Sequence, residues 1–217
     1  MTVVPLHKPR RSGQASRPAP AAPAPRDDAA LVHALVADEP SARAELFDRH
    51  APHVQRVLAR VLGHDSELPD LLHEVFARAL AQIELLADPS ALKAWLTGIA
   101  VFTAREQIRR RTRGRWLRFF ASEDLPDLPA VSAGEEVRES LRATYAVLGR
   151  LPVDDRIAFA LRFIEGLELG DVAAACGVSI NTIKRRLARA ETRFLALARR
   201  EPSLHDWLEG GTRCERK

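Results

Sequence analysis

Cysteine, aromatic residues and long apolar runs are all scarce in this chain of 217 residues. The two cysteines, Cys176 and Cys214, are too few for a structural zinc site or a disulfide-built secreted scaffold. No apolar run exceeds five residues, whereas a membrane-spanning helix needs about 20, and no apolar stretch follows the basic N-terminus as in a secretory signal. Aromatic residues make up 6% of the chain, while the strong helix formers Ala, Leu and Arg dominate it. We therefore expect an all-α, soluble, cytoplasmic protein without membrane insertion.

Lysine is scarce as well, because four of the 33 basic residues are Lys and the other 29 are Arg. The planar guanidinium of Arg donates two parallel hydrogen bonds and suits phosphates and guanine edges, although a codon bias toward Arg would also produce this composition. Position is more informative: residues 104–118 carry seven Arg, and residues 181–200 carry six Arg and one Lys. Residues 121–140 hold six acids and one base. Two basic clusters that flank an acidic segment indicate a nucleic-acid-binding protein.

The pattern along the chain predicts two small helical domains. Residues 1–26 contain six prolines, five bases and no acid, so we expect a disordered arm over residues 1–27. Apolar periodicity predicts helices over 29–36, 41–62 and 66–86, with Ser66 as an N-cap, and a further helix opened by Asp88 and Pro89. We assign residues 28–118 to the first domain, 119–138 to an acidic flexible linker, 139–200 to the second domain and 201–217 to a tail.

The second domain has the pattern of a helix-turn-helix. Helices are predicted over 135–148, 154–162, 169–176 and 180–197. Gly177 suits a left-handed turn between the last two helices, and Ser179 suits the N-cap of the last one. The inward face of that last helix is predicted to comprise Ile180, Ile183, Leu187, Ala190 and Phe194. Its outward face, placed to meet a DNA major groove, would comprise Lys184, Arg185, Ala188 and Arg189.

Two separate stretches resemble conserved regions of the sigma factors of bacterial RNA polymerase. Residues 70–76 (DLLHEVF), residues 95–100 (WLTGIA) and the run Arg109-Arg110-Arg111 resemble the second region. Residues 151–156, 165–166, 171–173 and 179–190 (SINTIKRRLARA) resemble the fourth region. Their order, their spacing and the linker between them resemble the small two-domain group called extracytoplasmic function (ECF) sigma factors, within the sigma-70 family. The resemblance spans residues 30–200.

The resemblance implies a protein that binds core RNA polymerase, through its β′ clamp and β flap, and directs initiation at promoter DNA without a cofactor. It implies that the residues docking on the clamp are Asp70, His73 and Glu74. It implies contacts to the promoter −10 element, beside a pocket for one unpaired base bordered by residues 86–91, from Arg105, Arg109, Arg110 and Arg113. It implies that the −35 element is read by Asn181, Thr182, Lys184, Arg185, Arg186 and Arg189. An anti-sigma factor is a further implied partner, and the acidic linker would follow the RNA path of the polymerase.

The sequence departs from this family at four positions. His73 stands where Gln is usual, and Phe102 stands where Asn is typical. Glu106 occupies an Asp position, and Asp171 replaces the usual Glu. Because a phenyl ring has no hydrogen-bonding group, Phe102 predicts altered promoter choice or weaker promoter melting. Trp95 is expected in the core rather than against a base.

Two other functions fit parts of the sequence. A stand-alone helix-turn-helix regulator explains the C-terminal half equally well, but it leaves the second-region pattern and the first Arg cluster unexplained. An enzyme is suggested by five histidines between residues 33 and 73. However, His73-Glu74 lacks the second His, four residues after the first, that a zinc-protease helix requires. We therefore assign no catalytic or metal-binding residue, and we expect Cys176 to be a small buried side chain.

Overall fold

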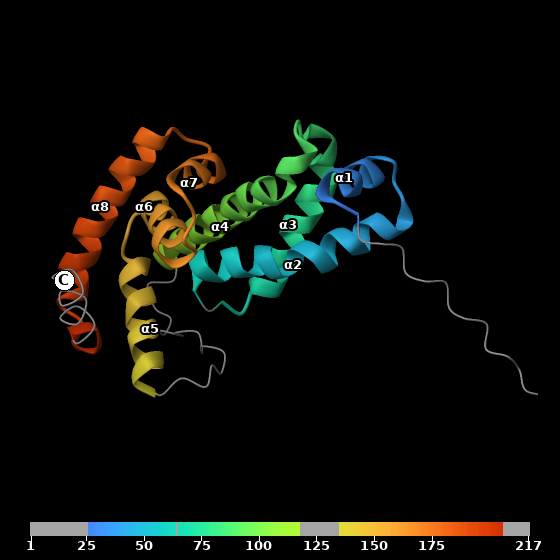
Figure 1. Ribbon diagram of the computed structural model, residues 1–217. Coiled ribbons are helices and arrows are strands. Elements are labelled where there is room, and N and C mark those ends of the chain that lie inside the picture. The colour runs from blue at the N-terminus through green and yellow to red at the C-terminus, as the bar shows by residue number, and fades with distance from the viewer. Residues whose placement is uncertain (1–25, 64, 118–134, 206–217) are drawn as a thin grey trace, which may run out of the picture.

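The computed structural model describes residues 26–63, 65–117 and 135–205, and all regular elements in these ranges are helices (Figure 1). The all-α prediction is confirmed. Three short 3-10 helices are η1 (Ile83–Leu85), η2 (Pro89–Ala91) and η4 (Pro202–Leu204), and one π-helical turn is η3 (Ala160–Ile164). The α-helices are α1 (Asp28–Val36), α2 (Pro40–Leu62), α3 (Leu68–Gln82), α4 (Leu92–Leu117), α5 (Glu135–Gly149), α6 (Val153–Phe159), α7 (Leu169–Cys176) and α8 (Ile180–Ala198).

Several predicted features lie outside the described residues. These are the proline-rich arm up to residue 25, most of the acidic linker, and the part of the tail beyond residue 205, with Cys214. Within the described ranges, no helix is long and apolar enough to span a lipid bilayer.

The first region, α1 to α4, forms around α2, which packs against both α3 and α4. Local signals place the helix starts: the Asp27 carboxylate accepts a hydrogen bond from the Ala30 N–H at 2.7 Å, and Asp88 caps η2 by accepting from the Ser90 N–H. The predicted Ser66 cap is wrong. Helix α3 begins at Leu68, with Pro69 in its first turn, and the Asp65 carboxylate accepts from the Glu67 N–H instead. Proline at this position favours the later start, because it lacks an N–H that would need a partner.

The second region, α5 to α8, contains the predicted helix-turn-helix of α7 and α8. Gly177 has φ +66°, in the left-handed region, and the Ser179 side chain accepts a hydrogen bond from the Thr182 N–H. Ile183, Leu187 and Ala190 are buried as predicted, whereas the inward placement of Ile180 is wrong, because its side chain is 45% exposed. Ile180 lies only about 20° around the helix from the buried Leu187, so its exposure follows from its place at the first position of α8 and not from its angle.

The two regions share one hydrophobic core. A continuous cluster of buried side chains runs from α2, α3 and α4 into α6, α7 and α8, and includes Cys176. Figure 1 shows α7 beside α4, with α8 on the outer side of α6 and α7. Arg156 on α6 donates hydrogen bonds to the carbonyls of Val61 and Leu62, 3.0 Å away in each case, at the C-terminal end of α2. Burial lowers the pKa of Arg156 to about 10. Its guanidinium thus satisfies carbonyls that the end of α2 leaves without helical partners.

Candidate nucleic-acid interface

The arginines of α4 divide into an exposed group and a group held in ion pairs. Arg109, Arg110 and Arg113 are exposed, and the described residues offer them no ion-pair partner. Arg111 pairs with Asp65 at 2.5 Å and with Glu67 at 2.8 Å. The side chains of residues 114–118, which include Arg115 and Arg118 of the predicted cluster, lie outside the part of the chain that the structure describes. The exposed group leaves three positive charges on the surface along the second half of α4.

Arg105, the fourth predicted −10 residue, is engaged by the second region. Its Nε lies 3.0 Å from Oδ1 of Asp154 on α6, and the other oxygen of the same carboxylate lies 3.3 Å from Nη2 of Arg186 on α8. The side chains of Arg105 and Arg186 are 17% and 15% exposed. One carboxylate therefore joins a predicted −10 residue to a predicted −35 residue.

The outer face of α8 carries the predicted −35 residues. Asn181, Lys184 and Arg185 are exposed, and Thr182 is half-buried beside the N-cap. Arg189 is exposed but donates to the buried carboxylate of Asp155 at 2.8 Å, and this hydrogen bond raises its pKa. Lys184 and Arg185, toward the N-terminal end of this face, have no ion-pair partner among the described residues. Arg186 and Arg189 instead form ion pairs with Asp154 and Asp155 at the start of α6.

The residues predicted to dock on polymerase share one face of α3. Asp70 and His73 are exposed, and the His73 ring stacks on Phe47 with ring centres 6.0 Å apart and planes inclined by 12°. Glu74 is half-buried and pairs with Arg78 at 2.5 Å. Asp70 precedes His73 and Glu74 by three and four residues, so it neighbours both of them on the helix surface. Their role in docking stays a prediction.

A cavity of about 690 Å³ opens beside residues 86–91, where the resemblance implies a base-binding pocket. Its lining includes Arg78, Leu86, Asp88, Trp95, Phe102 and Ala174, the last contributed by α7 of the second region. Trp95 packs against the core with one part of its surface, as predicted, and lines this cavity with another. In the sequence, Phe102 stands out only as a departure from the family, and no pattern marks Arg78. The sequence offered one signal for this cavity, since Phe102 is an aromatic residue that lies outside the buried face of α4.

Two of the five histidines that suggested an enzyme, His50 and His53, are buried and contact polar side chains of the fold. His53 is buried, and its Nε2 lies 2.8 Å from the Thr97 hydroxyl. His50, near the middle of α2, belongs to a polar network at the start of α1, where Arg49 and His50 lie 3.3 and 3.4 Å from the Asp28 carboxylate. Burial lowers the pKa of His50. Within the part of the chain that the structure describes, no three His, Cys, Asp or Glu side chains are grouped as a metal site requires. His64 lies outside this part.

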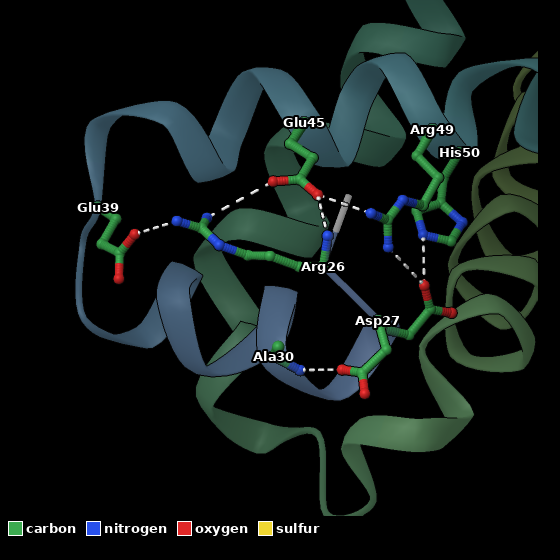
Figure 2. Close-up of polar contacts among 8 residues, drawn as sticks. Arg26, Asp27, Ala30, Glu39, Glu45, Arg49 and His50 are labelled. Carbon is green, nitrogen blue, oxygen red and sulfur yellow. Dashed lines mark hydrogen bonds and ion pairs between the residues drawn. The ribbon is translucent and has the colours of Figure 1, made fainter. Parts of the chain in front are cut away.

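The same polar network holds Arg26, the first residue that the structure describes. The Arg26 guanidinium pairs with Glu39 at 2.5 Å and with Glu45 at 3.5 Å, and its backbone N–H donates to Glu45 (Figure 2). Arg49 also pairs with Glu45, at 2.6 Å. These contacts attach the start of α1 to α2.

Comparison with known proteins finds two family matches in order along the chain. Residues 46–114 match sigma-70 region 2, and residues 141–194 match sigma-70 region 4. The probable RNA polymerase sigma-C factor of Mycobacterium bovis is 31% identical over 174 residues, which cover 78% of this chain and 91% of that protein. The ECF RNA polymerase sigma factor EcfG of Rhodopseudomonas palustris is 32% identical over 152 residues, which cover 67% of this chain and 79% of that one.

Two solved structures have a similar fold. The sigma factor RpoE of Bartonella quintana, in complex with the anti-sigma factor NepR, matches with a TM-score of 0.57 and 26% identity, over 73% of this chain and 97% of that one. CnrH, in complex with the cytosolic domain of CnrY, matches with a TM-score of 0.55 and 22% identity, over 80% of this chain and 98% of that one.

Proposed function

Because this chain belongs to the ECF group of the sigma-70 family and is an RNA polymerase sigma factor, we propose that its two basic faces divide promoter recognition between them. The observation that carries the proposal is the placement of exposed cations on α4, inside the region 2 match, and on α8, inside the region 4 match. Backbone phosphates need cations that are free at the surface, and both faces provide them.

On α4, Arg109, Arg110 and Arg113 contact the −10 element. The strand opened there is single, and its backbone needs cationic contacts while its bases need apolar or aromatic surfaces. The three arginines supply the cations, and the cavity next to residues 86–91 supplies such a surface. Arg105 joins them once it is released from Asp154.

On α8, Lys184 and Arg185 read the −35 element in the major groove, with Asn181 and Thr182 at the backbone near the helix N-terminus. Arg186 and Arg189 pair with Asp154 and Asp155 in the structure, so Arg186, like Arg105, reaches DNA only after it leaves Asp154. We assign these two arginines to phosphate contacts at the edge of the same site.

Partners follow from the same assignment. Asp70, His73 and Glu74 on α3 dock on the β′ clamp of core RNA polymerase, and the second region docks on the β flap. An anti-sigma factor covers the chain when it is inactive, as the structure of the similar RpoE with the anti-sigma factor NepR suggests. The site of action is the cytoplasm, where polymerase and promoter DNA meet. Family members act as initiation factors, and we assign this chain no catalytic role.

The division of labour is testable with two sets of substitutions in the polymerase holoenzyme. One set replaces Arg109, Arg110 and Arg113 by Ala, and the other replaces Lys184 and Arg185 by Ala. Binding is measured to a promoter selected by the holoenzyme from a random library, and to the same promoter with its −35 segment deleted. Loss of base and phosphate contacts should weaken binding by about 10-fold or more.

The two templates separate the two faces. The α8 set should lose affinity on the full promoter and none on the truncated one, whereas the α4 set should lose affinity on both. Arg43→Ala is the matched control, since Arg43 is an exposed arginine on α2, paired with Asp38, outside both faces. Equal losses for both sets on the truncated template would contradict the proposal.

A further inference from the structure

The start of α6 carries fewer carboxylates than the arginines that meet it. Asp155 is almost fully buried and pairs with two arginines of α8, Arg189 at 2.8 Å and Arg193 at 3.8 Å. Asp154 is shared in the same way, by one arginine of α4 and one of α8. Two carboxylates therefore face four guanidinium groups, and the ion pairs leave a surplus of positive charge where the two regions meet.

A cavity of about 220 Å³ opens next to these ion pairs. Arg109, Thr112 and Arg113 line it from α4, and Val153, which directly precedes Asp154, lines it from α6. Both arginines are exposed, and the described residues offer them no ion-pair partner. Six guanidinium groups thus stand against two carboxylates at this junction, and the cavity lies on the side where the positive charge is not neutralised.

The arrangement of the arginines shows which contacts are missing. Arg105, Arg109 and Arg113 are spaced by four residues, so they follow one face of α4 with about 6 Å between successive positions along its axis. Arg105 has its carboxylate in Asp154, and the next two have none. Nη1 of Arg186 is also buried without a hydrogen-bond partner among the described residues. An anion in the cavity would supply acceptors and negative charge where both are lacking.

We propose that this cavity binds a compact diphosphate group, either inorganic pyrophosphate or the phosphate chain of a free nucleotide. Arg109 and Arg113 hold the phosphate oxygens, because the planar guanidinium donates paired hydrogen bonds to phosphate. Two arginines one turn apart suit a ligand with two phosphoryl groups, and a charge of two or more offsets more of the surplus than a single charge does. Val153 and α6 stand on one side of these arginines, which favours a compact ligand over an extended strand.

The diphosphate and promoter DNA would exclude each other. The proposed function assigns Arg109 and Arg113 to the −10 element, so an occupied cavity withholds both arginines from the DNA strand. Because the cavity has walls from both regions, a bound ligand also favours the arrangement in which α6 lies against α4. We therefore expect the ligand to inhibit promoter recognition. This consequence, unlike the binding itself, rests on the proposed function.

Binding is tested on the free full-length chain by isothermal titration calorimetry at constant ionic strength. The probes are sodium pyrophosphate, ADP, AMP and sodium sulfate. One molecule of pyrophosphate or ADP should bind per chain, and AMP and sulfate should bind more weakly. Tighter binding of pyrophosphate would identify the inorganic anion as the ligand, and tighter binding of ADP would identify a nucleotide. No saturable binding of either diphosphate would overturn the proposal.

Two double variants separate the cavity from the other exposed cations. Replacing Arg109 and Arg113 by Ala should weaken pyrophosphate binding by about 10-fold or more, since it removes both charge-assisted contacts. Replacing Lys184 and Arg185 by Ala is the matched control, because it removes two unpaired cations from the outer face of α8. Equal losses in the two variants would show a general attraction to surface cations and would contradict the proposal.

Two further variants fill the cavity and keep every arginine. Thr112→Phe fills it from α4, where Thr112 is exposed, and Val153→Phe fills it from α6. Each should abolish pyrophosphate binding while circular dichroism shows that the helices are retained. Unchanged affinity in Thr112→Phe would show that the ligand does not occupy this cavity.

Transcription by the holoenzyme tests the inhibitory consequence. Pyrophosphate should reduce promoter-specific transcription more strongly with the wild-type chain than with Thr112→Phe, and its effects on polymerase itself are common to both. Equal inhibition would contradict the inhibitory role. If the wild-type holoenzyme makes no specific transcripts, the proposed function is wrong, whereas calorimetry on the free chain still decides whether the cavity binds a diphosphate.

Discussion

His53 lies inside the first region, where its side chain is 9% exposed. The Thr97 hydroxyl donates to the Lys93 carbonyl, so the Nε2–H of His53 donates to Thr97 and its Nδ1 is left facing Arg56 at 3.4 Å. Burial, with smaller effects of Lys93 and Arg56, lowers the pKa of His53 from 6.5 to about 4. The folded protein therefore keeps the ring neutral at pH values where the unfolded chain protonates it.

We expect the free energy of unfolding to decrease as the pH falls from 6.5 toward 4, because the unfolded chain binds a proton there that the folded protein excludes. The decrease attributable to His53 is about 2 to 3 kcal/mol, and the contribution is constant above that window. His53→Gln should make the dependence shallower in urea unfolding measured across the window. His33→Gln, at an exposed position, is the control; equal slopes in His53→Gln and the wild-type protein would argue against this role.

The arginines show what a sequence reveals at the scale of single residues. The clustering of arginines on α4 could be predicted, since it is a property of neighbouring positions. That Arg111 is tied to Asp65 could not, because the two are 46 positions apart and meet only through the packing of the fold. The same holds for Arg189 and Asp155, which are 34 positions apart.

The helix-turn-helix was the element most completely specified by its local sequence. Helix α7 has the predicted bounds, residues 169–176, because the glycine after it and the serine cap of α8 are signals carried by the turn itself. The Ser66 cap failed, since two competing residues, Asp65 and Pro69, lie within three positions of it. The capping of α2 by Arg156 was not predictable, because the two partners lie 94 and 95 positions away.

Gly177→Ala tests the turn of the helix-turn-helix. Nothing lies within 4 Å of a Cβ built at Gly177, so the cost arises from the left-handed backbone alone. We expect the free energy of unfolding to decrease by about 1 to 2 kcal/mol. Gly170→Ala is a matched control within α7, where the space is also open and φ is not positive, and it should raise stability by up to about 1 kcal/mol. Equal effects of the two substitutions in urea unfolding would contradict this reading of the turn.

At the scale of the whole molecule, the two regions are joined by a shared core and by the Arg105–Asp154–Arg186 contact. Sequence predicted the two helical regions separately, but no local pattern indicated that α7 packs on α4. For Arg105 and Arg186 to reach DNA, both must leave the Asp154 carboxylate. The contact therefore opposes DNA binding by both regions.

Asp154→Asn is expected to strengthen promoter binding by the holoenzyme, because it removes the charge that holds Arg105 and Arg186. The gain should be largest at low salt and decline as salt screens the released cations. Asp48→Asn on the exposed side of α2 removes one negative charge outside this contact and is the control. Equal affinities of Asp154→Asn and the wild-type chain at all salt concentrations would show that the bridge does not restrain either arginine.

We propose that this chain confers promoter recognition on RNA polymerase through both regions together. The most direct measurement combines the full chain with bacterial core RNA polymerase and sequences the transcripts made from a library of random promoters. We expect a stable complex with core enzyme and transcripts that start downstream of two shared elements. Tight binding of duplex DNA by the chain alone, without polymerase association or specific transcripts, would contradict it and would indicate a stand-alone regulator.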